Sequence, residues 1–372
     1  METKNKLPRF AELDGIRAIA ALAVFTHHFF ASRDLMKSSQ SYGMNAIAAL
    51  ATFGSLGINV FFVLSGFLIT SLLLLDRRNT NFFHNFYWKR ALRILPVYFV
   101  HLVVAAVIVG HAGGYIVLSL LFVVNFAGPL RVRDVGPAWT LSIEEQFYLI
   151  WPQFIRRRRL STIYYVAFAL VALSVSLRVL VPLWHGGWDS RYTIYECDAL
   201  ALGALLSCQW FSPAGRTRGI NRLLRILNSN VTLIVVVVVQ ALLLVYFPYG
   251  KFFYQAMMTS TGYLTYRTMR LIVSSGRTPK GLRWLANPAL TYIGAISYGL
   301  YMYHAYVLLL LDRHFGQINL DHHGATWARF VAALAITLIV CTISRYAMEL
   351  PIQKLRRFVL RPSRLDPSIP DF

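Results

Sequence analysis

The chain has 372 residues, of which 56% are hydrophobic and only 14% are charged, and its formal net charge is +21. Soluble domains carry about 45–50% apolar and about 25% charged residues, so this composition excludes a soluble globular protein. The basic residues lie in short clusters between apolar runs, which is typical of a membrane protein with a fixed orientation and excludes a nucleic-acid partner.

The apolar runs predict an all-α, polytopic integral membrane bundle of about ten transmembrane helices, since each crossing needs about 20 residues. The clearest run is VTLIVVVVVQALLLVYF, residues 231–247. Residues 1–350 are expected to form one transmembrane domain, and residues 351–372 a basic cytoplasmic tail. The expected spans are roughly 13–31, 56–75, 93–110, 139–155, 160–183, 195–211, 229–247, 252–275, 285–311 and 326–348.

The first span carries charged and titratable side chains. Arg17 and His28 are eleven residues apart, which places them within about 20° of one helix face and about 16 Å apart along the axis. His27 points about 80° away from that face, whereas Asp14 lies within pairing reach of Arg17. The pattern indicates a polar stripe through the membrane. The alternative is that Arg17 extends to lipid phosphates and His28 is a satisfied buried group.

Two arginines stand where an amphipathic stretch enters the third span. Arg90 and Arg93 lie in FYWKRALRILPVYF, residues 86–99. Their partners are expected to be either the headgroups of anionic lipids or a phosphate-rich ligand that docks from the cytoplasm.

The run YIVLSLLFVVNF, residues 115–126, is too short for a full crossing. If it does not cross, ten spans put all the basic clusters on the cytoplasmic side, with both termini there as well. We therefore expect residues 115–126 to be re-entrant or interfacial. The clusters lie at 4–9, 77–90, 156–159, 216–225, 277–283 and 354–364.

An acidic pair interrupts the apolar segment PAWTLSIEEQFYLIWP, residues 137–152. A carboxylate there is costly unless it is paired or protonated. A single one of them, Glu144 or Glu145, would serve as a counter-ion for an arginine within the membrane. Two together, beside Ser142 and Tyr148, indicate a functional site.

A fourth polar group lies in AISYGLYMYHAY, residues 295–306. Ser297, Tyr301 and His304 share one helix face. The competing interpretation is an interior polar stripe that locks helices together. Elsewhere the sequence has no phosphate-binding or serine-hydrolase motif, and we expect no metal site.

In this order, these segments resemble those of the acyltransferase-3 family of integral membrane acyltransferases. LDGIRAIAALAVFTHH resembles the family's opening Arg-x10-His signature, and GSLGINVFFVLSGFLIT resembles its second segment, with Asn59 where aspartate is common. WKRALRILPVYF and WTLSIEEQFYLIWP resemble its next two segments. CDALALGALLS and SYGLYMYHAYV resemble its later ones.

The resemblance implies an enzyme of the bacterial cytoplasmic membrane that moves an acyl group, expected to be acetyl, from cytoplasmic acyl-CoA to a hydroxyl at the outer face. The acceptor would be a glycan or glycolipid of the cell envelope, such as polysaccharide or lipopolysaccharide. Acyl-CoA would be a co-substrate, and no other cofactor is expected.

In this scheme Arg17, Arg90 and Arg93 would bind the phosphates of acyl-CoA. His28 would act as general base or carry the acyl group transiently. Glu144 would orient the imidazole of His28, and oxyanion donors would come from Ser142 and Tyr148. The supporting residues are Asp14, Asn59, Ser142, Tyr148, Ser297, Tyr301 and His304.

A proton-coupled exporter of a glycolipid or small molecule is the alternative of a different class, because it too needs arginine, histidine and glutamate within the membrane. The cytoplasmic arginines favour acyl transfer, since an exporter does not require them. Transfer from acetyl-CoA by the purified protein would distinguish the two.

Overall fold

The computed structural model describes residues 7–31, 42–109, 112–132, 136–184, 191–212, 218–246, 251–274, 278–316, 322–362 and 364–369. Within these residues the regular structure is helical, apart from one β-bridge between Asn79 and Leu365. This confirms the predicted all-α architecture.

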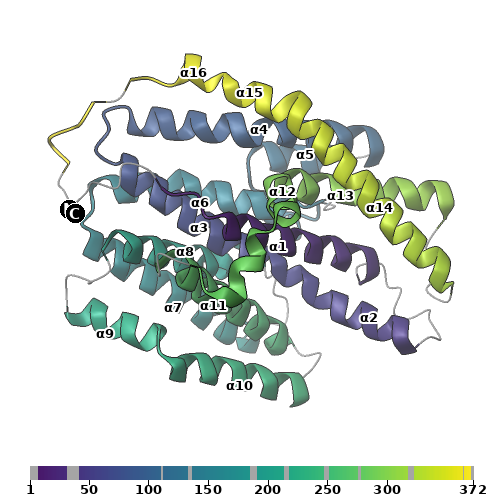
Figure 1. The fold of residues 1–372 in the computed structure, drawn as a ribbon, viewed down its shortest axis with the longest axis horizontal. Coiled ribbons are helices and arrows are strands. Elements are labelled where there is room, and N and C mark those ends of the chain that lie inside the picture. The colour runs from purple at the N-terminus through teal and green to yellow at the C-terminus, as the bar shows by residue number, and fades with distance from the viewer. Residues whose placement is uncertain are drawn as a thin grey trace.

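The elements follow one another from α1 in the centre of the bundle to the short helices at the C-terminus (Figure 1). The α-helices are α1 (Ala11–Phe30), α2 (Tyr42–Thr52), α3 (Gly57–Asp76), α4 (Phe82–Val109), α5 (Gly113–Leu120), α6 (Ala138–Arg157), α7 (Leu160–Trp184), α8 (Thr193–Phe211), α9 (Arg218–Leu227), α10 (Asn230–Tyr246), α11 (Lys251–Ser274), α12 (Pro288–Ala295), α13 (Ser297–Phe315), α14 (His323–Ser344), α15 (Leu350–Lys354) and α16 (Arg356–Val359). The 3-10 helices are η2 (Phe53–Leu56), η3 (Val124–Phe126) and η4 (Lys280–Ala286), and η5 (Arg345–Glu349) is a π-helical turn.

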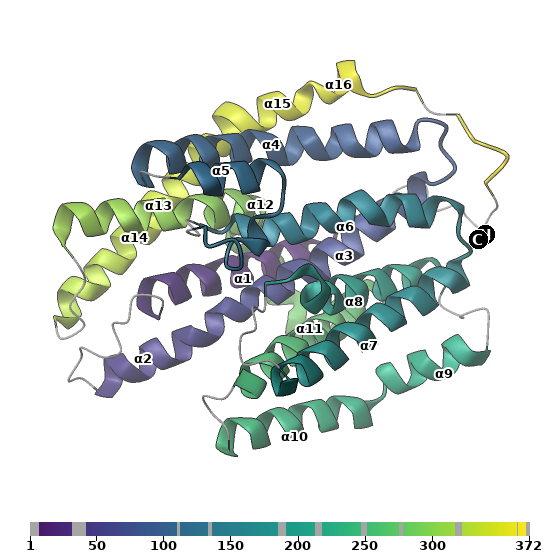
Figure 2. The same ribbon diagram turned by 180° about the vertical axis from the view of Figure 1, so that it is seen from behind.

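The long helices lie side by side along the long axis of the molecule. Helices α9 and α10 form one edge of the bundle, and α15 and α16 lie at the opposite edge (Figures 1 and 2). Helix α1 lies between them and packs against α3, α12 and α13. Within this packing, the polar side chains Asp14, Arg17, His27 and His28 of α1 are half-buried.

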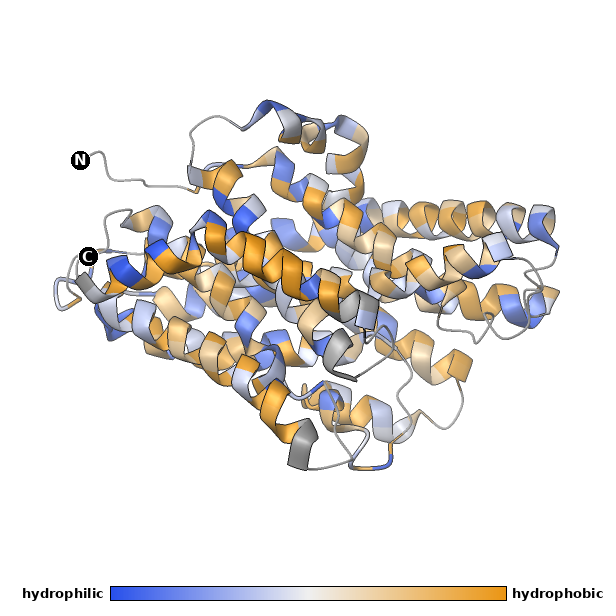
Figure 3. Cartoon of the chain, turned by 90° about the horizontal axis from the view of Figure 1, so that it is seen from below, coloured by the Kyte–Doolittle hydropathy of each residue, from blue (hydrophilic) through white to orange (hydrophobic). Residues whose placement is uncertain are grey.

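Hydrophobic residues form long stretches of the helices at the outside of the bundle (Figure 3), and many of their side chains are exposed. On α10, Val231 is 70% exposed and Ile234 is 60% exposed. A continuous apolar surface of this kind is stable only against another apolar phase, which for this chain is lipid.

By length and hydropathy, the structure has four segments that can cross a membrane, or up to six if each of two bent helix pairs counts as one span. Helices α1, α6 and α8 fall outside this count because charged side chains lower their hydropathy. Ten crossings therefore remain a prediction. The four segments are Tyr42–Asp76, Phe82–Val109, Leu160–Val181 and His323–Val359.

The stretch expected to be re-entrant or interfacial folds as a short helix, a turn and a 3-10 helix. Helix α5 has 8 residues, which corresponds to about 12 Å against a hydrocarbon core of about 30 Å. After it, Phe122 adopts a positive φ of 53°, and η3 follows. This geometry supports the expectation that residues 115–126 do not cross.

Close packing of α3 on α8 depends on two glycines. A Cβ atom on Gly66 would overlap the carbonyl oxygen of Leu200, and one on Gly203 would overlap that of Val63. Small residues allow helix backbones to approach in this way, which is a common means of association within membranes.

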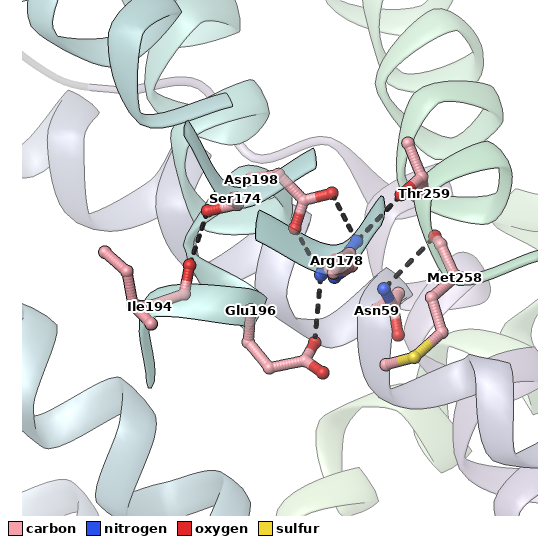
Figure 4. Close-up of polar contacts among 8 residues, drawn as sticks. All are labelled: Asn59, Ser174, Arg178, Ile194, Glu196, Asp198, Met258 and Thr259. Atoms are coloured by element: carbon pink, nitrogen blue, oxygen red, sulfur yellow. Dashed lines mark hydrogen bonds and ion pairs between the residues drawn. The ribbon is translucent and has the colours of Figure 1, made fainter. Parts of the chain in front are cut away.

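A buried ion cluster joins α7, α8 and α11 at the side of this contact (Figure 4). The guanidinium of Arg178 donates to both carboxylate oxygens of Asp198, at 2.6 and 2.8 Å, and to the hydroxyl of Thr259 at 2.8 Å. Glu196 lies 3.6 Å from the same guanidinium. Asn59 borders this cluster and donates to the carbonyl of Met258 at 3.1 Å.

The end of the chain is held against the loops that carry basic clusters. Leu365 pairs with Asn79 of the α3–α4 loop. Asp366 lies 3.1 Å from Arg156 at the end of α6. The expected tail therefore packs on the transmembrane helices over its described part.

Two further contacts place the starts of α1 and α7 and the end of α8 at this same end of the bundle. Tyr164, near the start of α7, donates to the carbonyl of Ser212, just after α8. The ring of Trp210 lies 5.6 Å from that of Phe10, which precedes α1. The clusters at 77–90, 156–159 and 354–364 and the start of α1 therefore share one end, here called the basic end. That this end is cytoplasmic is a prediction from charge.

We predict that a reporter fused after Arg159 reads as cytoplasmic, because α5 is too short to reverse the orientation of the downstream helices. Reporter activity in intact cells measures this directly. A reporter after Arg78 should give the same result, since both positions lie at the basic end. An external signal after Arg159 with a cytoplasmic one after Arg78 would mean that residues 115–126 cross.

Candidate active site

A cavity of about 230 Å³ lies between α1, α3, α4, α6 and α13. Asp76 and Lys89, which form an ion pair at 3.0 Å, line it near the basic end. The residues that the sequence singled out and that line it are Arg17, Arg90, Arg93, Glu144, Ser297 and Tyr301. Tertiary structure thus brings residues from four of the polar segments to one cavity.

Arg90 is the most heavily partnered cation of the cavity. Its guanidinium lies 3.6 Å from Glu144 and 3.4 Å from Glu145. It also stacks on the ring of Tyr148, with Cζ 3.4 Å from the ring centroid. Ser65 donates a 2.6 Å hydrogen bond to the other carboxylate oxygen of Glu144. Two carboxylates and an aromatic face therefore compensate this charge and fix its position.

Arg93 lies one turn further along α4 and differs from Arg90 in its contacts. Its side chain lines the cavity and is exposed to it. With every residue that the structure describes, it forms neither a hydrogen bond nor an ion pair. By contrast, Arg17 lies 3.6 Å from Asp14, which is also bound by Arg9 at 3.0 Å. Arg93 is thus a cation available to an anionic ligand.

His28 lies beyond the cavity, on the last turn of α1. Its Nδ1 lies 2.9 Å from the carbonyl oxygen of Val24. A carbonyl only accepts, so Nδ1 carries the proton and Nε2 of the neutral ring keeps the lone pair that a general base needs.

The ring of His304 packs against that of His28, and the two ring centroids are 4.8 Å apart. The Nδ1 atom of His304 faces the carbonyl of Leu300 at 3.0 Å, and its Nε2 has no hydrogen-bond partner among the described residues. Tyr301, which lines the cavity, has its ring centroid 6.0 Å from that of His304. A row of rings thus leads from the cavity to His28.

The two neighbouring histidines of α1 have different surroundings. His27 directs Nδ1 toward the carbonyl of Ala51 on α2, at 3.2 Å, whereas His28 packs on α13. This agrees with the helical rotation expected between them.

Glu144 contacts Arg90 and Ser65, whereas the imidazole of His28 packs against the rings of His304 and His27. Ser142 donates to the carbonyl of Ala138 within its own helix. These contacts place Glu144 with the arginines and Ser142 in helix packing. Asn59 borders the Arg178 cluster (Figure 4) and is not among the residues that line the cavity.

Sequence reasoning missed several cavity residues, namely Ser65, Lys89, Thr140 and Tyr298. All four lie inside the quoted motifs, so motif membership was the available signal. The hydroxyl of Thr140 lies 2.9 Å from that of Tyr301, and Tyr298 bonds to the carbonyl of Ile94 on α4. Within the described residues, no group of three His, Cys, Asp or Glu side chains could hold a metal ion.

Comparison with known proteins shows what the chain is similar to. The family model described as an acyltransferase domain matches residues 10–346. The chain is 26% identical to a putative peptidoglycan O-acetyltransferase, YrhL, of Bacillus subtilis, over 92% of this chain and 54% of that protein. It is likewise 26% identical to the peptidoglycan O-acetyltransferase OatA of Listeria monocytogenes, over 92% of this chain and 55% of that one.

A putative O-acetyltransferase of Staphylococcus aureus is 25% identical over 97% of this chain and 60% of its own length. The chain therefore spans little more than half the length of these relatives. No solved structure matches it.

The contrast between the two arginines of α4 generates a stability prediction. Replacing Arg90 by Gln leaves Glu144 and Glu145 close together without their cation, which we expect to cost up to about 3 kcal/mol. Replacing Arg93 by Gln breaks no ion pair, so its effect should be within about 0.5 kcal/mol. Thermal unfolding of the purified variants in detergent compares them. Equal destabilisation by both substitutions would contradict the described pairing.

Proposed function

This chain belongs to the acyltransferase family whose domain it matches over residues 10–346, and from that membership we propose that it is a membrane O-acyltransferase. It takes an acyl group, acetyl in its named relatives, from acyl-CoA at the basic, cytoplasmic end. It delivers this group to a hydroxyl of a glycan or glycolipid at the outer side. The observation that carries the proposal is Arg93, which has no ion-pair partner among the described residues and lines a cavity that adjoins the row of rings ending at His28.

The donor would enter at the basic end. Arg93 would bind a phosphate of acyl-CoA, with Arg17 of α1 as a second cation in the cavity lining. A guanidinium binds phosphate through two parallel hydrogen bonds, which gives both affinity and orientation. Arg90, already compensated by Glu144 and Glu145, would shape the wall and contribute less charge.

The thioester arm would occupy the cavity, whose lining combines aromatic and aliphatic side chains with the hydroxyls of Thr140 and Tyr301. Its volume of about 230 Å³ suits a slender acyl-bearing arm and leaves the nucleotide at the basic end. Tyr301 would hydrogen-bond the thioester oxygen as negative charge develops on it.

Transfer would occur near His28. Nε2 takes the proton of the acceptor hydroxyl, the acceptor oxygen attacks the thioester carbonyl, and the C–S bond breaks. The imidazolium then gives the proton to the CoA thiolate. In a second route Nε2 of His28 attacks the thioester carbonyl and the C–S bond breaks with release of CoA; the acceptor hydroxyl then attacks the acyl-imidazole, loses its proton and releases the imidazole. We assign His304 to hold the ring of His28, and Glu144 to hold Arg90.

The acceptor class rests on the relatives alone. Two of the matched proteins are named for O-acetylation of peptidoglycan, so we propose a glycan of the cell envelope. Mass spectrometry of envelope glycans from cells with and without the gene tests it. An unchanged glycan profile, together with transfer from acetyl-CoA to no glycan in vitro, would contradict this part.

The exporter alternative makes a different demand on the cavity. A carrier must open its binding site to both sides and has no need for an unpaired cation near the cytoplasm. Incubation of the purified protein with labelled acetyl-CoA separates the two functions. Release of CoA in the presence of a glycan acceptor supports transfer, whereas transport without CoA release would support the exporter.

For the donor, we predict that Arg93→Gln weakens acetyl-CoA binding by about 10–100-fold, the scale of one lost charged hydrogen bond of about 1.5–3 kcal/mol. Calorimetric titration of the purified protein measures this. Arg329→Gln is the matched control, since Arg329 pairs with Asp312 outside the cavity. If Arg93→Gln binds acetyl-CoA as tightly as this control does, Arg93 is not a donor-binding residue.

For the chemical step, we predict that His28→Ala lowers acyl transfer by about 10²–10⁴-fold, the scale of a lost general base. His27→Ala should retain most of the activity, because its ring faces α2. Both rates are measured at equal amounts of folded, membrane-inserted protein. An inactive His27→Ala beside an active His28→Ala would reverse the assignment, and two active variants would remove histidine from the mechanism.

A further inference from the structure

A second cavity lies beside the edge helices α9 and α10, apart from the candidate active site. Its volume is about 460 Å³. It is bounded by the end of α8, the inner side of α9 and the second half of α11. Its lining residues are Gln209, Asn221, Leu224, Arg225, Asn228 and Arg270.

Among the residues that the structure describes, the lining contains two guanidinium groups and three amides but no carboxylate. Arg270 is oriented by one bond, from its Nε to the side-chain oxygen of Gln209 at 3.3 Å. Arg225 is exposed and has neither a hydrogen-bond nor an ion-pair partner among the residues that the structure describes. The cavity thus presents positive charge that the protein itself does not neutralise.

A network of buried polar groups fixes the floor of this cavity. The amide of Gln209 donates to the hydroxyl of Tyr266 at 2.6 Å, and that hydroxyl donates to Asn228 at 2.8 Å. The oxygen of Gln209 also lies 3.4 Å from the amide nitrogen of Asn228. Because protein donors occupy the side-chain oxygens of Gln209 and Asn228, the groups left for a ligand are the two guanidinium groups and the amide of Asn221, and the guanidinium groups select an anion.

The setting of α9 indicates where that anion comes from. Leu223 is 38% exposed and Ile226 is 56% exposed on the same helix as Arg225. A short helix that exposes both arginine and large apolar side chains is typical of the membrane interface. Helix α10 continues from α9 after a bend of 47° and carries an exposed apolar surface. The cavity therefore opens where lipid headgroups meet the bundle.

We propose that this cavity binds the phosphate group of an anionic phospholipid from the leaflet at the basic end. Arg225 and Arg270 contact the phosphate oxygens, and the amide of Asn221 donates to the headgroup. The acyl chains of the lipid lie along the apolar surface of α10. Such a lipid joins the edge pair α9–α10 to the bundle through α8 and α11. The proposal does not depend on acyl transfer.

The test measures thermal stability of the purified full chain in detergent during titration with phosphatidylglycerol, phosphatidylcholine or inorganic phosphate. Phosphatidylglycerol should raise the unfolding midpoint at concentrations where the other two have no effect. Arg225→Gln and Arg270→Gln should each weaken the apparent affinity about tenfold, the scale of one lost charged hydrogen bond.

Arg222→Gln is the matched control, because Arg222 lies on the same helix and does not line the cavity. It should change the apparent affinity less than twofold. Asn221→Asp leaves both arginines in place and should weaken binding by repulsion, which keeps the test decisive if Arg270→Gln unfolds. Equal losses in Arg222→Gln and Arg225→Gln would show diffuse attraction and overturn the proposal. So would equal stabilisation by phosphatidylcholine, or by inorganic phosphate at the same concentration.

Discussion

Inside a lipid-bounded bundle, each charged side chain must find its partner within the protein, because no bulk water is present to solvate it. This constraint organises the helix contacts. Arg178 is satisfied only where α7, α8 and α11 meet, and Arg90 only where α4 reaches the acidic pair of α6. Removing either guanidinium would leave carboxylates without compensation, so these pairs specify which helices are neighbours as well as stabilising them.

Arg93 is an exception to this pairing of charges, and the exception indicates a binding role. Arg93 lines a cavity and makes no ion pair with the described residues, while Arg90, three positions earlier, has two carboxylates and an aromatic ring around it. The neighbouring pair holds α4 in place, so the exposed guanidinium is presented from a rigid support. A preorganised cation of this kind binds an anion without first breaking an internal contact.

The two proposed steps, donor binding and acyl transfer, take place at different positions along the bundle. Arg93 and Arg17 lie on the cavity side, whereas His28 packs against His304 near the other end of α1. Helix α1, packed against α3, α12 and α13, runs from one of these regions to the other. The edge pair α9–α10 does not line this cavity, so it can serve a separate role at the membrane interface.

The sequence by itself determined the membrane class, the helical architecture and the order of the polar segments. It also separated His28 from His27, because these properties depend on composition and on the rotation of about 100° per residue within one helix. It did not determine which charges pair. Glu144 is joined to Ser65, and Arg178 to Asp198, across helices whose mutual rotation and depth follow from backbone contacts such as those at Gly66. Only the tertiary structure decided these partners, since a pair of charges within 4 Å is set by how whole helices pack and not by the local pattern of either helix.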